Sequence, residues 1–313
     1  MRLRFLAIAC LFSAAAVASA ADSALLKFVM PDAKVVSGIN VDSIRLTPFG
    51  QFFLSLLPAP DAGFEQAIAV TGFDPRRDIH EILMASPAEP GKKTGLLLVR
   101  ADFDKGRILT LLKAVGKTPE IYNGVEILAA PAAPNRISQA LTFLDSSVVA
   151  AGDVDSVKAA IDRQKTAAAL DPALLAAIAA MSANRDAWVV STASISSFAK
   201  SVPNANVSGV LQGDLIKAIQ QSSGGVTFGS TIEISGELTT KTNEDASSLA
   251  SVVQFFVTMA QGAGHPELTT LIQSLSVHSD SNAVKVSLSI PEAVLETIVK
   301  VSQHTGVRTA PRI

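Results

Sequence analysis

The densest group of polar side chains is the run at residues 74–81 (DPRRDIHE). Two guanidinium groups can hold an anionic ligand through paired hydrogen bonds, and a histidine can act as an acid or a base near neutral pH. The candidate binding residues are therefore Arg76, Arg77, Asp78 and His80. Because the run starts with Asp-Pro and precedes an apolar segment, a solvated turn is the alternative interpretation.

A second candidate for chemistry is the Ser-x-x-Lys spacing at Ser197 and Lys200. In serine acyl-enzymes a helix places such a lysine one turn from the nucleophile, and residues 93–95 (KTG) resemble a further motif of the penicillin-recognising enzymes. Those enzymes carry Ser-x-x-Lys first and Lys-Thr-Gly last, which is the reverse of the order here. The nearest third element, residues 279–282 (SDSN), has one residue too many. We therefore predict no catalytic residue from this pattern.

The sequence also lacks the common metal and cofactor motifs. No Gly-x-Ser-x-Gly elbow, His-Glu-x-x-His pair, P-loop or Gly-x-Gly-x-x-Gly turn occurs in it. The four histidines, His80, His265, His278 and His304, are too scattered to suggest a set of metal ligands. We predict no metal site and no cofactor, and the sequence favours a binding protein over an enzyme.

The N-terminal segment has the order of a secretory signal peptide. Arg2 and Arg4 precede an apolar run from Phe5 to Val17, which closes with the small residues 18–20 (ASA). The run is shorter than the roughly 20 residues that span a bilayer. We expect residues 1–20 to be removed, which would make the protein secreted or periplasmic.

Removal of this segment would leave a chain without cysteine, because Cys10 is the only one. Disulfides, thiolate metal ligands and cysteine nucleophiles would then be excluded. A lipid anchor on Cys10 is the alternative, but it requires cleavage before the apolar run is complete. The remaining 24 basic and 28 acidic residues give a charge of −4, so no nucleic-acid partner is indicated. No later segment predicts a transmembrane anchor.

Two similar segments indicate an internal duplication. Residues 32–44 (DAKVVSGINVDSI) and 186–198 (DAWVVSTASISSF) are identical at six positions, with an offset of 154 residues. Each half of the chain also ends with a strand, a polar turn, a strand and an amphipathic helix. This common order supports a tandem repeat of one unit.

Local patterns predict the individual elements. Apolar periodicity predicts helices near residues 49–57, 108–115 and 246–259, and Asp153 and Asp171 are candidate N-caps of two more. Apolar runs predict strands at 35–39, 81–84, 96–99, 189–192 and 231–235. The Asn-Gly pair at residues 123–124 predicts a hairpin turn, and the Gly-Gly pair at 224–225 predicts a loop.

These elements predict an α+β fold of two tandem, internally duplicated domains. The first would span residues 21–166, and the second, opened by an alanine-rich helix, would span 167–303, followed by a flexible tail at 304–313. Each domain is expected to have an antiparallel or mixed sheet with helices mainly on one face.

Three segments carry a resemblance to known proteins. The runs 35–41 (VVSGINV), 47–51 (TPFGQ) and 72–79 (GFDPRRDI) make the chain similar, mainly over residues 32–165, to uncharacterised secreted proteins of bacteria, particularly of acidobacterial type. The resemblance implies a bacterial envelope setting and transfers no catalytic residue and no function.

The function that these observations favour is that of an exported, non-enzymatic binding or envelope-associated protein. Its partner would be a ligand or another envelope protein, bound in the cleft that a duplicated architecture creates. The first alternative is an exported hydrolase whose active-site residues are distant in the sequence. The second is a structural or assembly module that pairs through strand edges.

Overall fold

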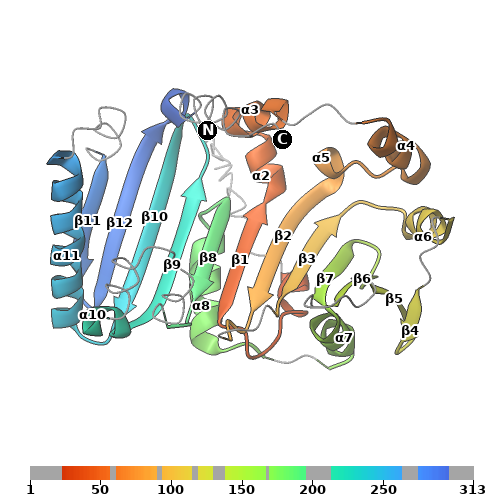
Figure 1. The fold of residues 1–313 in the computed structure, drawn as a ribbon. Helices are drawn as coiled ribbons and strands as arrows, with labels where there is room; N and C mark the ends of the chain where they lie inside the picture. Colours follow the sequence, from red (N-terminus) through yellow and green to blue (C-terminus); the bar gives the residue numbers. More distant parts are fainter. Residues whose placement is uncertain are drawn as a thin grey trace, which may run out of the picture.

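A computed structural model describes residues 23–56, 61–89, 94–114, 119–129, 138–166, 169–194, 213–262 and 274–295. Within these residues the strands form one antiparallel sheet of twelve strands, in the order β11-β12-β10-β9-β8-β1-β2-β3-β7-β6-β5-β4 (Figure 1). The prediction of an α+β fold is confirmed. The strands of both predicted domains belong to this one sheet, which differs from the separate sheet that we expected in each domain.

The strands are β1 (Val35–Asn40), β2 (Ile79–Ser86), β3 (Leu96–Ala101), β4 (Glu120–Tyr122), β5 (Val125–Ala129), β6 (Gln139–Phe143), β7 (Val148–Asp153), β8 (Ala187–Ser191), β9 (Ile219–Thr227), β10 (Thr231–Thr240), β11 (Leu275–Asp280) and β12 (Ala283–Pro291). The helices are α1 (Ser23–Leu26), α2 (Val41–Arg45), α3 (Pro48–Leu56), α4 (Ala62–Thr71), α5 (Pro75–Asp78), α6 (Lys105–Ala114), α7 (Val154–Arg163), α8 (Pro172–Ser182), α10 (Asp214–Lys217) and α11 (Asn243–Gly262).

The two similar segments meet at the centre of the sheet, where β1 and β8 pair antiparallel. Val36 lies opposite Val190, and these two residues are equivalent at the offset of 154. On either side of them, Val35 faces Ser191 and Ser37 faces Val189. Since Val189 and Ser191 are the equivalents of Val35 and Ser37, the pairing has a local two-fold pattern about the Val36–Val190 pair.

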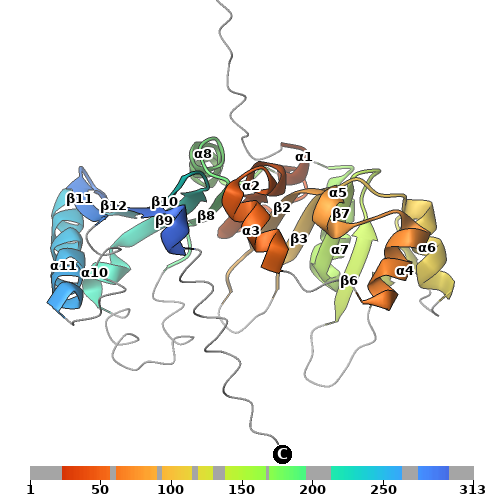
Figure 2. The same ribbon diagram turned by 90° about the horizontal axis from the view of Figure 1, so that it is seen from above.

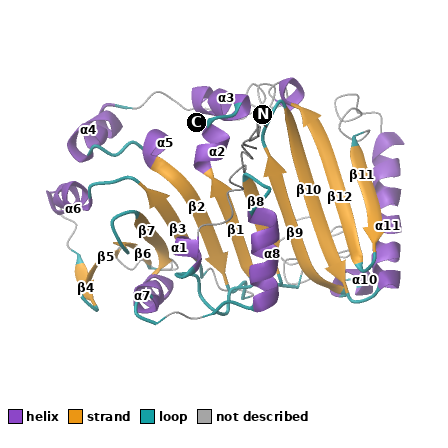
Figure 3. Cartoon of the chain, turned by 180° about the vertical axis from the view of Figure 1, so that it is seen from behind, coloured by secondary structure: helices purple, strands orange, loops and turns teal. Residues whose placement is uncertain are grey.

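One face of the sheet is covered by α1, α7 and α8, which lie in front of the strands in Figure 3. Leu83, Leu98 and Val190 point from the strands toward this layer, and the main hydrophobic core forms there with Leu174 and Ile178 of α8. These five side chains are at most 1% exposed. Because successive residues of a strand point to opposite faces, the neighbours of the strand residues face the other side.

A second, smaller core lies at the other end of the sheet, where α11 packs against β10, β11 and β12. Ala246, Leu249 and Ala250 of the helix contact Ile219 and Val284 of the strands. The view from above separates this end from the one that carries α4 and α6 (Figure 2).

The predicted caps and hairpin are confirmed. Asp153 accepts hydrogen bonds from the amides of Ser156 in α7 and Gly95 beside β3, both at 2.9 Å. Burial alone raises the pKa of Asp153, but these hydrogen bonds more than offset it and hold the pKa below its usual value. At the β4–β5 hairpin, Asn123 and Gly124 have φ angles of 50° and 84°, as a tight turn requires.

The prediction of a loop at residues 224–225 is wrong, because both glycines lie inside β9. At Gly225 a Cβ would come within 2.6 Å of the Arg185 side chain, whose Nε donates to the Ser235 hydroxyl at 2.9 Å. Glycine is therefore needed there for the close approach of a side chain across the sheet.

Several predictions fall on residues that the structure does not describe. These are the signal peptide at 1–20, the tail at 304–313, and Ser197 and Lys200 of the acyl-enzyme spacing. Among the described residues, no helix combines the length and hydropathy needed to cross a membrane.

Candidate functional site

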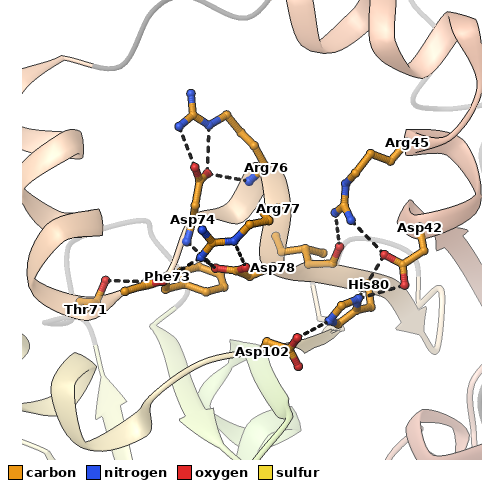
Figure 4. Close-up of polar contacts among 12 residues, drawn as sticks. Asp42, Arg45, Thr71, Phe73, Asp74, Arg76, Arg77, Asp78, His80 and Asp102 are labelled. Carbon is orange, nitrogen blue, oxygen red and sulfur yellow. Dashed lines mark hydrogen bonds and ion pairs between the residues drawn. The ribbon is translucent and has the colours of Figure 1, made fainter.

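The polar run at residues 74–81 forms a short helix, α5, and the start of β2 (Figure 4). The Asp74 carboxylate caps the helix by accepting from the Arg76 amide at 3.0 Å, while Pro75 occupies the first turn. The Arg76 guanidinium returns to the same carboxylate with contacts of 2.9 and 2.7 Å. This pairing holds the pKa of Asp74 below its usual range and raises that of Arg76.

Arg77 and Asp78 form a second pair in the same turn. The Arg77 guanidinium donates to both carboxylate oxygens of Asp78 and to the Gly72 carbonyl at 3.1 Å. Asp78 also accepts from the Asp74 amide at 2.7 Å, so it closes the turn. Its pKa is lowered, chiefly by the hydrogen bond from Arg77. Both predicted arginines thus have a carboxylate partner from their own turn.

His80 lies between two carboxylates that come from other elements. Its Nδ1 is 2.9 Å from Asp42 of α2, and its Nε2 is 3.1 Å from Asp102, which follows β3. Arg45 binds Asp42 at 3.0 Å and the Ile79 carbonyl at 2.6 Å, which fixes the far side of this group. The histidine therefore links α2 to the segment that leads into α6.

This geometry limits the chemistry that the polar cluster can perform. A base needs a ring nitrogen that is free to meet a substrate, but both nitrogens of His80 already face carboxylates. An anion would have to compete with Asp74 and Asp78 for the two guanidiniums. The cluster brings Arg76, Arg77 and Asp78 together in one turn, with His80 in a separate contact group.

An apolar pocket lies next to this cluster, on the face of the sheet opposite α1 and α8. Two helices form its outer wall. α4 begins after Asp61, which accepts from the Phe64 amide at 2.8 Å, and ends at Gly72, whose φ of 75° suits glycine. α6 begins after Asp104, which accepts from the Arg107 amide at 3.0 Å, and it contacts α4.

The pocket has a volume of about 420 Å³. Apolar side chains from α4, α6, the segments beside them and the strands β2, β3, β6 and β7 surround it, together with one threonine. The lining residues are Phe64, Ala67, Ile68, Thr71, Phe73, Pro75, Ile79, Val99, Ala101, Phe103, Ile108, Leu112, Leu141, Phe143 and Val149.

The threonine of this pocket is already satisfied. The Thr71 hydroxyl donates to the Ala67 carbonyl at 2.6 Å and accepts from the Phe73 amide at 3.2 Å. Among the described lining side chains no free polar group is left, so the interior can hold hydrocarbon and offers no hydrogen bond to it.

Cationic side chains lie over the aromatic walls of the pocket. The Lys105 ammonium is 6.0 Å from the centre of the Phe143 ring, and the Arg76 guanidinium is 5.7 Å from that of Phe64. Phe143 packs in turn against Phe103 at 5.0 Å. The pocket therefore combines an apolar interior with positive charge at its wall.

Two other cavities are smaller. One of about 390 Å³ lies over β1, β2, β3 and β7, and includes Val35, Met84 and Leu97. Another of about 340 Å³ lies between α2, α3 and α5, and includes Arg45 and Arg76. The first has no aromatic lining residue and the second has only Phe53, whereas the α4–α6 pocket is lined by four phenylalanines.

The whole sheet, with its helices, can be compared with known structures. The fold is similar to that of TP0453, a Treponema lipoprotein. A crystal structure of TP0453 aligns with 88% of this chain and 97% of its own, with a TM-score of 0.50 and 9% sequence identity. No protein-family model matches the chain, and no curated protein sequence matches it. At this identity the similarity to TP0453 establishes the fold alone.

The sequence analysis missed the pocket residues. Phe64, Ile68 and Thr71 follow a helical spacing that could have predicted α4, but such a stripe is also typical of a core helix. Of the predicted site residues, Arg76 lies over the Phe64 wall, and Arg77, Asp78 and His80 lie beside the pocket rather than in its lining.

Among the described residues, no group of three metal-binding side chains lies together. His80 has two carboxylates near it, but they lie at opposite edges of the ring. Of the other histidines, His278 lies in β11, and His265 and His304 are outside the described residues.

Proposed function

We propose that this chain is an exported, non-enzymatic protein that binds an apolar ligand in the α4–α6 pocket. One observation carries the proposal: a pocket of about 420 Å³ is lined by apolar side chains and one internally satisfied threonine. Ligand pockets commonly have about 300–1,000 Å³ and are lined mainly by hydrophobic and aromatic groups.

A simple packing defect is a weaker explanation of this volume. Protein interiors are packed densely, and an apolar void costs stability because its walls lose contacts. This pocket is partly open to solvent, so its apolar walls face water unless a ligand covers them. Covering these walls with the hydrocarbon of a ligand removes apolar area from water, which favours binding.

Export is the second part of the proposal. The order of charged, apolar and small residues at positions 1–20 supports removal of a signal peptide and a secreted or periplasmic mature chain. The resemblance to secreted bacterial proteins agrees with this location. A ligand, rather than nucleic acid, is then the expected partner.

We also propose that residues 21–166 and 167–303 derive from one duplicated unit. The strand order β11-β12-β10-β9-β8 on one side of the centre parallels β6-β7-β3-β2-β1 on the other. The self-equivalent pair Val36–Val190 at the centre supports the same relation. In this view the β4–β5 hairpin is an addition to the first half.

The binding proposal predicts that Ala67→Phe will weaken binding of the fluorescent apolar probe N-phenyl-1-naphthylamine. Ala67 lines the pocket from α4, and a phenyl group there would fill much of the space that a ligand needs. We expect the dissociation constant to rise by at least about tenfold, the equivalent of about 1.4 kcal/mol. Fluorescence titration of the purified protein measures this change.

Ala69→Phe is the matched control, because Ala69 lies on the same helix, is exposed and is not a lining residue. It adds the same surface apolar group and should leave probe binding within about twofold. Equal binding by wild type and both variants would contradict the proposal, as would a failure of the wild type to bind the probe.

A further inference from the structure

We propose that the ligand of the α4–α6 pocket is a fatty acid, with its hydrocarbon chain in the pocket and its carboxylate on the Lys105 ammonium. This inference rests on the proposed function and names the chemical class of its ligand.

The position of Lys105 carries the first step. It is the first residue of α6, is half-buried, and holds its ammonium 6.0 Å from the centre of the Phe143 ring. Phe143 is only 4% exposed and forms part of the pocket wall with Phe103. Lys105 does not itself line the pocket, and its ammonium next to this wall ring lies beside the pocket, where the polar end of a bound ligand would emerge.

The ammonium of Lys105 is available to pair with a ligand. Of its acidic neighbours in the sequence, Asp104 contacts Arg107 at 3.4 Å and Asp102 contacts His80 at 3.1 Å. Within the described part of the chain, no carboxylate forms an ion pair with Lys105. Arg76 and Arg107 differ from Lys105 in this respect, because each of them forms an ion pair with an aspartate.

The chemistry of the pocket gives the third step. Its interior offers no free hydrogen-bonding side chain among the described residues, so the buried part of the ligand is hydrocarbon. A lysine ammonium is a point charge that pairs with either a carboxylate or a phosphate, so the size of the pocket is what favours a single-chain carboxylic acid. A volume of about 420 Å³ is at the small end of the usual range and suits one chain rather than two.

The test compares dodecanoate with 1-dodecanol as competitors of N-phenyl-1-naphthylamine, in the full mature chain. The two compounds have the same chain and differ in the charged group. For Lys105→Gln we expect binding of dodecanoate to weaken by about tenfold and binding of dodecanol to stay within about twofold. Lys105→Arg keeps the charge and should retain most of the affinity for dodecanoate.

Each outcome has a distinct meaning. If wild type binds both compounds and Lys105→Gln changes neither, or changes both equally, the carboxylate assignment is wrong and the apolar pocket stands. If wild type binds neither compound and no probe, the proposed function itself fails. Tighter binding of vesicles of dodecanoyl-containing phospholipid than of dodecanoate would overturn the assignment in favour of a lipid headgroup. Circular dichroism checks that each variant is folded.

Discussion

Trp188→Ala is expected to lower the free energy of unfolding by about 3–5 kcal/mol, the cost typical of deleting a large buried aromatic group. Trp188 is 6% exposed and belongs to the main core, although it lies in the strand that opens the second half of the sheet. The loss would show that β8 is packed as an integral part of one sheet. Urea unfolding followed by circular dichroism measures it, since the variant has no tryptophan left.

The contact between Trp188 and Gly38 allows a second, coupled substitution to test the same packing. The two residues are paired across β1 and β8, and a Cβ on Gly38 would lie 2.5 Å from two atoms of the indole ring. Gly38→Ala should therefore cost about 1–3 kcal/mol when Trp188 is present, as overpacking does. In the Trp188→Ala background the same substitution should be neutral or stabilising, because the clash is gone and alanine is favoured over glycine in a strand.

Val189→Ala is the control for this cycle. Val189 is the next residue along β8, points to the other face and is 42% exposed, so we expect a loss of under about 1 kcal/mol. Additive effects of Trp188→Ala and Gly38→Ala would contradict the central β1–β8 pairing, because directly contacting residues must couple.

Leu98→Ala is expected to destabilise the protein by about 2–5 kcal/mol. Leu98 is fully buried in β3 and points toward the layer formed by α1, α7 and α8. Its loss would leave a cavity in the main core that the surrounding strands cannot close. Urea unfolding at neutral pH measures the change.

The adjacent Leu97 provides a matched comparison. It is the same residue type in the same strand, but it points to the opposite face, is half-buried and lines the open cavity there. Leu97→Ala should therefore cost less than half as much as Leu98→Ala. Equal losses would refute the assignment of the main core to one face of the sheet.

Local structure could be predicted from the sequence because its causes are local. Asp153 and Asp171 cap their helices through contacts with residues two or three positions away, and the Asn123–Gly124 turn needs only its own φ angles. The Gly224–Gly225 pair misled the prediction, since its reason lies in Arg185, which approaches from outside the strand.

The single sheet could not be predicted, because its decisive contact joins residues far apart in the sequence. Nothing in the residues around Val36 or Val190 indicates that these strands pair with each other rather than with strands of their own half. Strand patterns show which residues face a core and do not identify the partner strand. The similarity of residues 32–44 and 186–198 was visible in the sequence, and the pairing of these two segments at the centre of the sheet was not.

The candidate site shows the same limit. The two carboxylates that contact His80 belong to Asp42 and Asp102, which lie in two other parts of the chain. The pocket collects apolar side chains from three helices, four strands and the segments between them, and each of these side chains has the pattern of an ordinary core residue. Only the packing of the whole fold shows that space is left between them.

The most direct test of the ligand-binding proposal is native mass spectrometry of the mature protein, purified from a bacterial envelope fraction as wild type and as Ala67→Phe. We expect the wild type to carry one small apolar molecule per chain, with the mass of a fatty acid after extraction, and Ala67→Phe to be free of it. If neither the wild type nor Ala67→Phe carries a ligand, or if both carry the same molecule, the result would contradict a ligand site between α4 and α6.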